Sequence, residues 1–179
     1  MPSVITPIAS VAGLSGVLSS FVMNVEIASK SKSNHRHDKS SNWRSVKSFE
    51  GLLRANARAA RPVDWPPLEP HLPLKERPLV VVGMVGATML DAANLPKSVT
   101  DALEDVCCVT DASVRAVAAL TQRTKKPVLS LALICCDPGA LAAANISVEM
   151  GLADLVSHAI VAATAAFGIA VADYDASRA

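Results

Sequence analysis

The chain has 179 residues, of which 51% are hydrophobic and only 3% aromatic, so its core must be built from Ala, Val and Leu. The net charge of +1 is unevenly spread: residues 1–61 hold nine Lys or Arg against three acids, whereas residues 62–179 hold eight against thirteen. This asymmetry indicates two parts with different roles, and the acidic second part excludes a basic nucleic-acid-binding surface there.

The first part, residues 1–60, reads as a basic, Ser-rich N-terminal extension. Within residues 4–28, apolar side chains recur at helical spacing (Leu14, Leu18, Phe21 and Val25), and a basic run follows. Twelve Ser and only three acids among residues 1–50 are typical of an organellar transit peptide. A disordered basic tail and a membrane anchor are the alternatives.

Residues 61–78 include six prolines, which predicts an extended linker because proline lacks an N–H donor and fixes φ. Just before this linker, residues 48–60 are expected to form a short helix with Phe49, Leu52 and Leu53 on one face. The linker separates the extension from a domain at residues 79–179, and residues 1–60 are therefore expected to be dispensable for folding.

The domain is predicted to be α/β, with a small three-stranded parallel sheet and flanking helices. The expected strands are 79–82, 106–109 and 128–134, and the expected helices are 86–95, 99–105, 112–123, 137–150 and 152–172. Gly83, Cys107 and Cys135 end the strands at steps of one βα unit. A mostly α-helical, membrane-associated chain is the alternative fold.

A ligand site is predicted where the three strands would end. In an open parallel sheet ligands bind beyond the carboxyl ends of the strands, and helix N-termini there attract anions. The candidate ligand-binding residues are Gly83, Gly86, Thr88, Asp111 and Asp137. They predict a small anionic metabolite or a nucleotide; the ligand, its cofactor and any catalytic residue are not identified, and no metal is expected.

The segment from Val82 to Thr88 resembles the phosphate-binding turn of lactate and malate dehydrogenases, shortened from three glycines to the two of G-x-x-G. The resemblance implies a Rossmann-like fold that binds a nucleotide. No acidic residue ends the second expected strand, where a ribose hydroxyl would bind; Asp111 lies a few residues further on. The alternative is that Gly83 and Gly86 only permit a tight turn.

Four cysteines form two adjacent pairs, Cys107–Cys108 and Cys135–Cys136, without the spacing of a disulfide framework. We therefore expect reduced, packed thiols in an intracellular compartment, which would be an organelle if residues 1–60 include a transit peptide. Cys108-Val109-Thr110 also resembles the strand-end thiol segments of aspartate and glutamate racemases, which implies a reactive thiol.

Residues 155–172 lack any charge and reach the minimum length of a membrane span. Helix 152–172 is apolar nearly all round, so we expect a homodimer contact or a membrane contact through it. Three functional hypotheses follow: a binding domain for an anionic metabolite, a non-enzymatic membrane-associated or assembly protein, and a weakly specified Ala/Val-rich frame.

Overall fold

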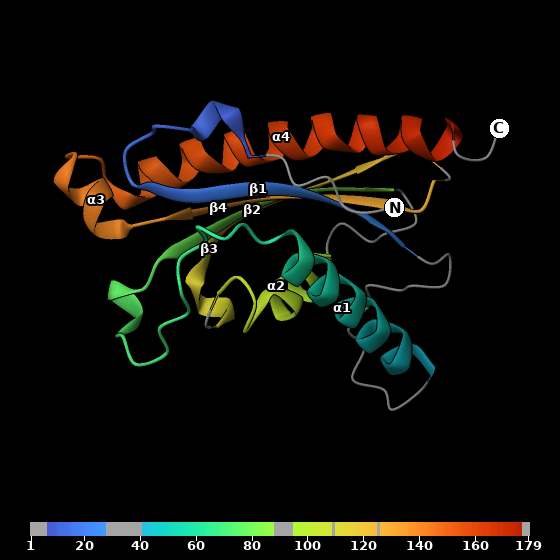
Figure 1. The fold of residues 1–179 in the computed structure, drawn as a ribbon, viewed down its shortest axis with the longest axis horizontal. Coiled ribbons are helices and arrows are strands. Elements are labelled where there is room, and N and C mark those ends of the chain that lie inside the picture. The colour runs from blue at the N-terminus through green and yellow to red at the C-terminus, as the bar shows by residue number, and fades with distance from the viewer. Residues whose placement is uncertain (1–6, 28–40, 88–94, 109, 125, 177–179) are drawn as a thin grey trace.

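The computed structural model describes residues 7–27, 41–87, 95–108, 110–124 and 126–176. They form three layers, with a β-sheet between helices (Figure 1). Helices α1 (Ser41–Ala60) and α2 (Leu95–Leu103) cover one face of the sheet, and the long helix α4 (Val148–Ala176) covers the other. The predicted α/β class is confirmed.

The described residues form a sheet of four strands: β1 (Val17–Glu26), β2 (Leu79–Ala87), β3 (Val114–Gln122) and β4 (Val128–Cys136). Their spatial order is β1-β4-β2-β3, with β2 and β3 parallel and β4 antiparallel to both of its neighbours. Every residue of the two central strands β2 and β4 is buried, which agrees with their almost entirely apolar sequences; Ser130 in β4 is the polar exception. The predicted three-stranded parallel sheet is therefore wrong in strand number and direction.

Two segments predicted as helices are strands. Phe21, Met23 and Val25 alternate inward along β1, and this period of two places them against the core below α1. The segment expected as helix 112–123 is a short 3₁₀ turn followed by β3, which pairs with β2. Residues 106–108, expected in a strand, lie in the turn after α2, where Val106, Cys107 and Cys108 donate backbone hydrogen bonds to Leu103 O.

The buried residues form two apolar clusters, one on each face of the sheet. On the α1/α2 face, Leu53 and Val99 belong to a cluster with buried residues of β1, β2 and β4, and partly buried residues of β3 pack against it. On the other face, α4 presents a stripe at steps of three and four residues: Leu152, Leu155, Ala159, Ala163 and Phe167. Because this stripe contains two alanines, the helix backbone lies close to the sheet.

Residues on both sides of the proline-rich segment share this core. β1 pairs with β4 along its length, and α1 packs on α2 and β1. Trp65, inside the segment itself, is buried against Phe21 with the ring centroids 5.1 Å apart. The proline-rich segment therefore does not coincide with a boundary in the packing.

The remaining elements are short. They are α3 (Pro138–Ala143) and three 3₁₀ turns, η1 (Ala9–Val11), η2 (Leu74–Glu76) and η3 (Asp111–Ser113). The predicted N-cap at Asp137 is confirmed, since its carboxylate accepts a hydrogen bond from Gly139 N at 2.8 Å. The predicted helix break at Gly151 is wrong: Gly151 lies within α4, and the break lies between α3 and Val148. Asn145, in this break, has a left-handed φ of 55°. The predicted helix 86–95 falls largely outside the described residues, and Gly86 belongs to β2.

Candidate functional site

The four candidate ligand-binding residues that the structure describes do not come together at one site. Gly83 and Gly86 lie inside β2 and are buried, so the expected strand-to-helix turn at Gly83 is wrong. Thr88 lies outside the described residues. Asp111 and Asp137 lie at the opposite end of the sheet from Gly86, since Val80 pairs with Val114 and Leu79 pairs with Cys136 there.

Gly83 serves the packing of α4 on the sheet. A Cβ atom at this position would lie 2.4 Å from the Ala159 carbonyl carbon and 2.6 Å from Ile160 N. Real Cβ atoms do not approach backbone atoms so closely, so only glycine lets α4 lie directly on β2. The position therefore has a structural role that does not depend on a phosphate group.

Asp111 and Asp137 share one end of the sheet but belong to different local structures. Asp111 begins the three-residue turn η3, and its N–H donates to Glu104 Oε1 at 2.9 Å. The Asp137 carboxylate already caps α3, and its own N–H donates to Gly16 O at 2.8 Å. These contacts give both aspartates a role in joining loops to the sheet.

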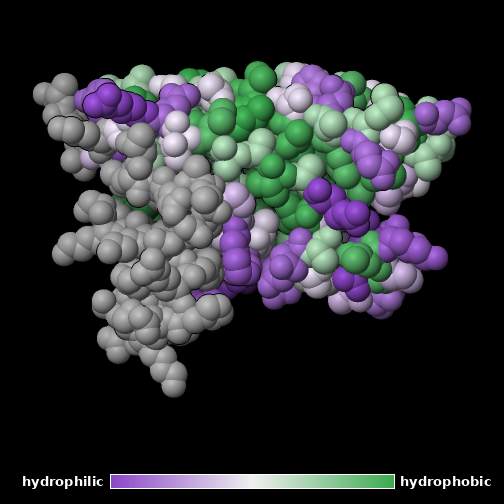
Figure 2. All heavy atoms as spheres, turned by 180° about the vertical axis from the view of Figure 1, so that it is seen from behind, coloured by the Kyte–Doolittle hydropathy of each residue, from purple (hydrophilic) through white to green (hydrophobic). Residues whose placement is uncertain are grey.

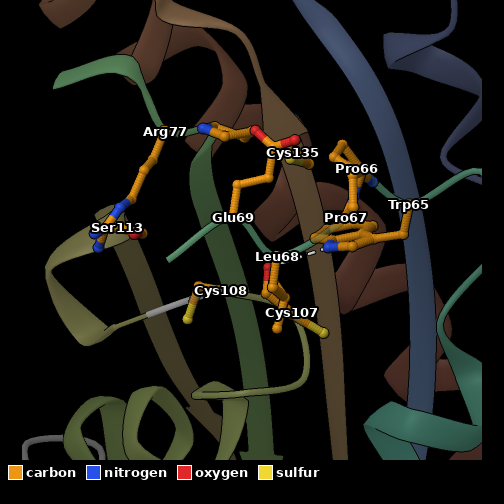
Figure 3. A pocket seen from close by; sticks show the side chains of 11 residues that line it. Trp65, Pro66, Pro67, Leu68, Glu69, Arg77, Cys107, Cys108, Ser113 and Cys135 are labelled. Carbon is orange, nitrogen blue, oxygen red and sulfur yellow. Dashed lines mark hydrogen bonds between the residues drawn. The ribbon is translucent and has the colours of Figure 1, made fainter. Parts of the chain in front are cut away.

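A small pocket lies at the same end of the sheet (Figure 3). It lies between the proline-rich segment, the turn after α2 and the end of β4. Its lining residues are Trp65, Pro66, Pro67, Leu68, Glu69, Arg77, Pro78, Cys107, Cys108, Ser113 and Cys135. The space inside measures about 20 Å³, which is enough for about one water molecule and far too small for a nucleotide.

The polar groups around this pocket are mostly engaged in holding the chain together. Arg77 donates to Leu72 O at 2.7 Å and to Pro70 O at 2.7 Å, and Trp65 Nε1 donates to Cys107 O at 3.0 Å. The buried Ser113 hydroxyl has no hydrogen-bond partner among the described residues.

The sequence prediction did not include Trp65, Arg77 or Ser113 among the site residues. The available signal was a tryptophan within a proline-rich segment, because a large aromatic side chain in an extended segment indicates packing against the domain. Ser113 carried no comparable signal, since its burial depends on the pairing of β3 with β2.

The four thiols are free and buried. Burial raises the pKa of Cys107 to about 12, with a further contribution from neighbouring Cys108. Burial raises the pKa of Cys108 to about 12, with Glu104 adding to the rise, and that of Cys136 to about 11. Burial also raises the pKa of Cys135 far above its usual range. The thiols are therefore protonated at neutral pH, which suits packing and opposes the reactive role implied by the racemase resemblance.

The positions of the thiols follow partly from strand alternation. Cys135 and Cys136 face opposite sides of the sheet, as their places in β4 require. Cys107 and Cys108 both belong to the cluster below α1 and α2, because they lie in a turn and not in a strand. In the part of the chain that the structure describes, no group of three His, Cys, Asp or Glu side chains is arranged to hold a metal ion.

The second candidate region is the outer face of α4. The sheet covers only one stripe of this helix, and only 22% of the residues in an apolar 18-residue stretch of α4 are buried. Val161 and Ile169 on the uncovered side are 67% and 62% exposed. By length and composition α4 is able to cross a membrane, as is also true of some core helices in soluble proteins.

Compared with known proteins, the chain matches no protein-family model, no curated protein and no solved structure.

Proposed function

We propose that this chain is a non-enzymatic assembly protein, whose role is to associate with another protein chain. The observation that carries the proposal is the uncovered apolar surface on α4 and β3. Val161 and Ile169 on α4, together with Val117 and Leu120 on β3, are between 37% and 67% exposed. Seen from the β3 side of the sheet, apolar residues gather across the middle of the molecule below α4 (Figure 2). Exposed apolar surface of this kind marks interaction sites.

The pocket and the thiols support a role without catalysis. The pocket accommodates about one water molecule, so it offers no space for a metabolite. Its three thiols are held protonated by burial, and an unionised thiol is a poor nucleophile. The anionic-metabolite hypothesis is weakened, because Asp111 and Asp137 lie at one end of the sheet and Gly86 lies near the other.

Membrane association is the second candidate function, because α4 is long and apolar enough to span a bilayer. The charges of α4 favour a protein partner instead. Its 29 residues include Glu149, Asp154, Asp173 and Asp175 and no Lys or Arg. Helices that lie on membranes carry basic residues on their polar face, since lipid surfaces are often anionic.

Two measurements on the purified full-length chain test the proposal. Sedimentation velocity over a range of concentrations should give a mass above the 18.6 kDa of one chain. Flotation with neutral and with anionic lipid vesicles should leave the protein at the bottom of the gradient. Flotation with either vesicle would favour the membrane function, and a monomer at every concentration would contradict an assembly function based on self-association.

A Val161→Lys/Ile169→Lys double variant tests whether the outer face of α4, and not another part of the surface, contributes to association. Both side chains are exposed, so the charged variant should retain its fold. If this face contributes to association, the variant should form less oligomer. Ala55→Lys is the matched control, because Ala55 is exposed on α1, on the other side of the sheet.

A further inference from the structure

The two edges of the sheet differ in how well they are covered. At one edge, five of the ten residues of β1 are buried. Ile8 N donates to Ser20 Oγ, and Ser19 Oγ donates to Asp64, so other segments are attached to this strand. At the other edge, none of the nine residues of β3 is fully buried. An uncovered edge strand presents unpaired N–H and C=O groups to any strand that can pair with it.

β3 largely lacks the features that usually prevent edge pairing. Its register with β2 is irregular only at its start, where Arg115 is the extra residue between Val114 and Ala116. From Ala116 to Gln122 the register is regular, and this stretch has no proline and no charged side chain. Val117 and Leu120 are exposed on it by 37% and 49%. The strand is therefore regular over seven residues, apolar over the five from Ala116 to Leu120, and not fully buried at any of them.

The charges that flank β3 are opposite at its two ends. Acidic residues lie before the strand. Burial is the main cause that raises the pKa of Cys108, and the negative charges of Glu104, Asp105 and Asp111 raise it further. All three carboxylates therefore lie near the Cys108 thiol. The exposed Arg123 lies directly after the strand. An antiparallel neighbour with the same sequence would place its basic end against this acidic end, and the contact would occur twice.

We propose that β3 pairs antiparallel with β3 of a second copy of this chain, about a twofold axis at Ala118, so that one sheet runs through both copies. The inference rests on the proposed assembly function and names its partner and contact. The charges disfavour the neighbouring register about Ala119. An axis at Ala119 would set Arg115 opposite Arg123, whereas an axis at Ala118 sets Arg115 opposite Thr121 and Arg123 opposite Ser113, next to the acidic flank.

Site-specific disulfide cross-linking tests the contact. Ala118→Cys should give a covalent dimer under mild oxidation, because the two substituted residues face each other across the axis. The native cysteines provide a low background, since each is at most 3% exposed. Ala165→Cys on the outer face of α4 and Ala55→Cys on α1 are exposed controls that should remain monomeric on a non-reducing gel.

Charge reversal provides a second test that does not depend on the cysteine variants. Arg123→Asp alone should raise the dissociation constant of the dimer by about tenfold or more, and Asp111→Arg alone should act in the same direction. The double variant should recover much of the affinity, because each copy again presents opposite charges to the other. Thermal melts of all variants check that the fold is retained.

The outcomes separate this inference from the function on which it rests. Cross-linking at Ala118→Cys with rescue by the double reversal supports β3 pairing. An oligomer that cross-links through Ala165→Cys but not through Ala118→Cys, or that the charge reversals leave unchanged, overturns β3 pairing and leaves the assembly function in place. A monomer at all concentrations overturns β3 pairing and, with it, an assembly function based on self-association.

Discussion

Substitution of Gly83 by alanine tests the close approach of α4 to the sheet. The new Cβ would lie 2.4 Å from the Ala159 carbonyl carbon, whereas ordinary contacts begin near 3.4 Å, so helix and strand must separate by about 1 Å. The obstructing atoms are helix backbone and cannot rotate away. A gap of this size weakens the dispersion contacts of the buried stripe, including Leu155 and Phe167. We expect a loss of ~3 kcal/mol in the free energy of unfolding.

For a chain of this length such a loss corresponds to a fall of roughly 6–12 °C in Tm, measured by circular dichroism at 222 nm. Gly168→Ala is the matched control, because it changes the same residue type in α4 where no atom lies within 4 Å of the added Cβ. The control should be neutral or stabilising by ~0.5–1 kcal/mol, since alanine favours helix. If Gly83→Ala has the same Tm as the wild type, the backbone of α4 at Ala159 does not contact β2 at Gly83.

Three further predictions concern β1, Trp65 and the thiols. Phe21→Ala should destabilise the protein by ~3–5 kcal/mol in urea unfolding, because Phe21 is fully buried against Trp65; little change would show that β1 lies outside the core. Trp65→Phe should cost ~1–3 kcal/mol, because it leaves the Cys107 carbonyl without its donor, and unchanged stability would contradict that hydrogen bond. Folding raises the thiol pKa from an ordinary 9.0 to about 12 at Cys107 and about 11 at Cys136, so the unfolded chain ionises first. Stability should then be constant below pH 9 and fall between pH 9 and 12, and native thiols should label slowly at pH 8; rapid labelling would refute their burial.

The sequence was sufficient to predict the elements whose local signals agree with their packing. The apolar runs of β2 and β4, the Asp137 cap with Pro138 at the helix start, and the long apolar helix in α4 were all recognised. Each of these is specified by residues that adjoin in the sequence, so it does not require knowledge of the fold.

β3 was mispredicted because its local preferences oppose its final state. Val114, Val117 and Leu120 recur at a spacing of three, and the intervening alanines favour helix. Pairing with the buried strand β2 overrides that preference, and no local pattern reveals the pairing. β1 is different, since Phe21, Met23, Val25 and Ile27 alternate with period two and did carry a strand signal beside the helical one.

The candidate site depended on strand direction, which single-sequence patterns do not encode. Three parallel strands at 79–82, 106–109 and 128–134 would have brought Gly83, Asp111 and Asp137 to one edge, but Asp111 precedes the strand β3 and does not follow a strand. With β4 antiparallel, Asp137 instead lies near the start of β2, and Gly86 lies near its end. The five-residue connection between β3 and β4 was the available clue, because a parallel neighbour needs a much longer crossover.

The position of β1 at the edge next to β4 has a consequence during synthesis on the ribosome. β1 is made first among the strands, yet Val25 finds its partner Leu129 only after most of the chain has been translated. Until then Phe21 and Met23, both fully buried in the finished fold, face solvent in the nascent chain. Such distant pairing slows folding and exposes an apolar strand to other chains.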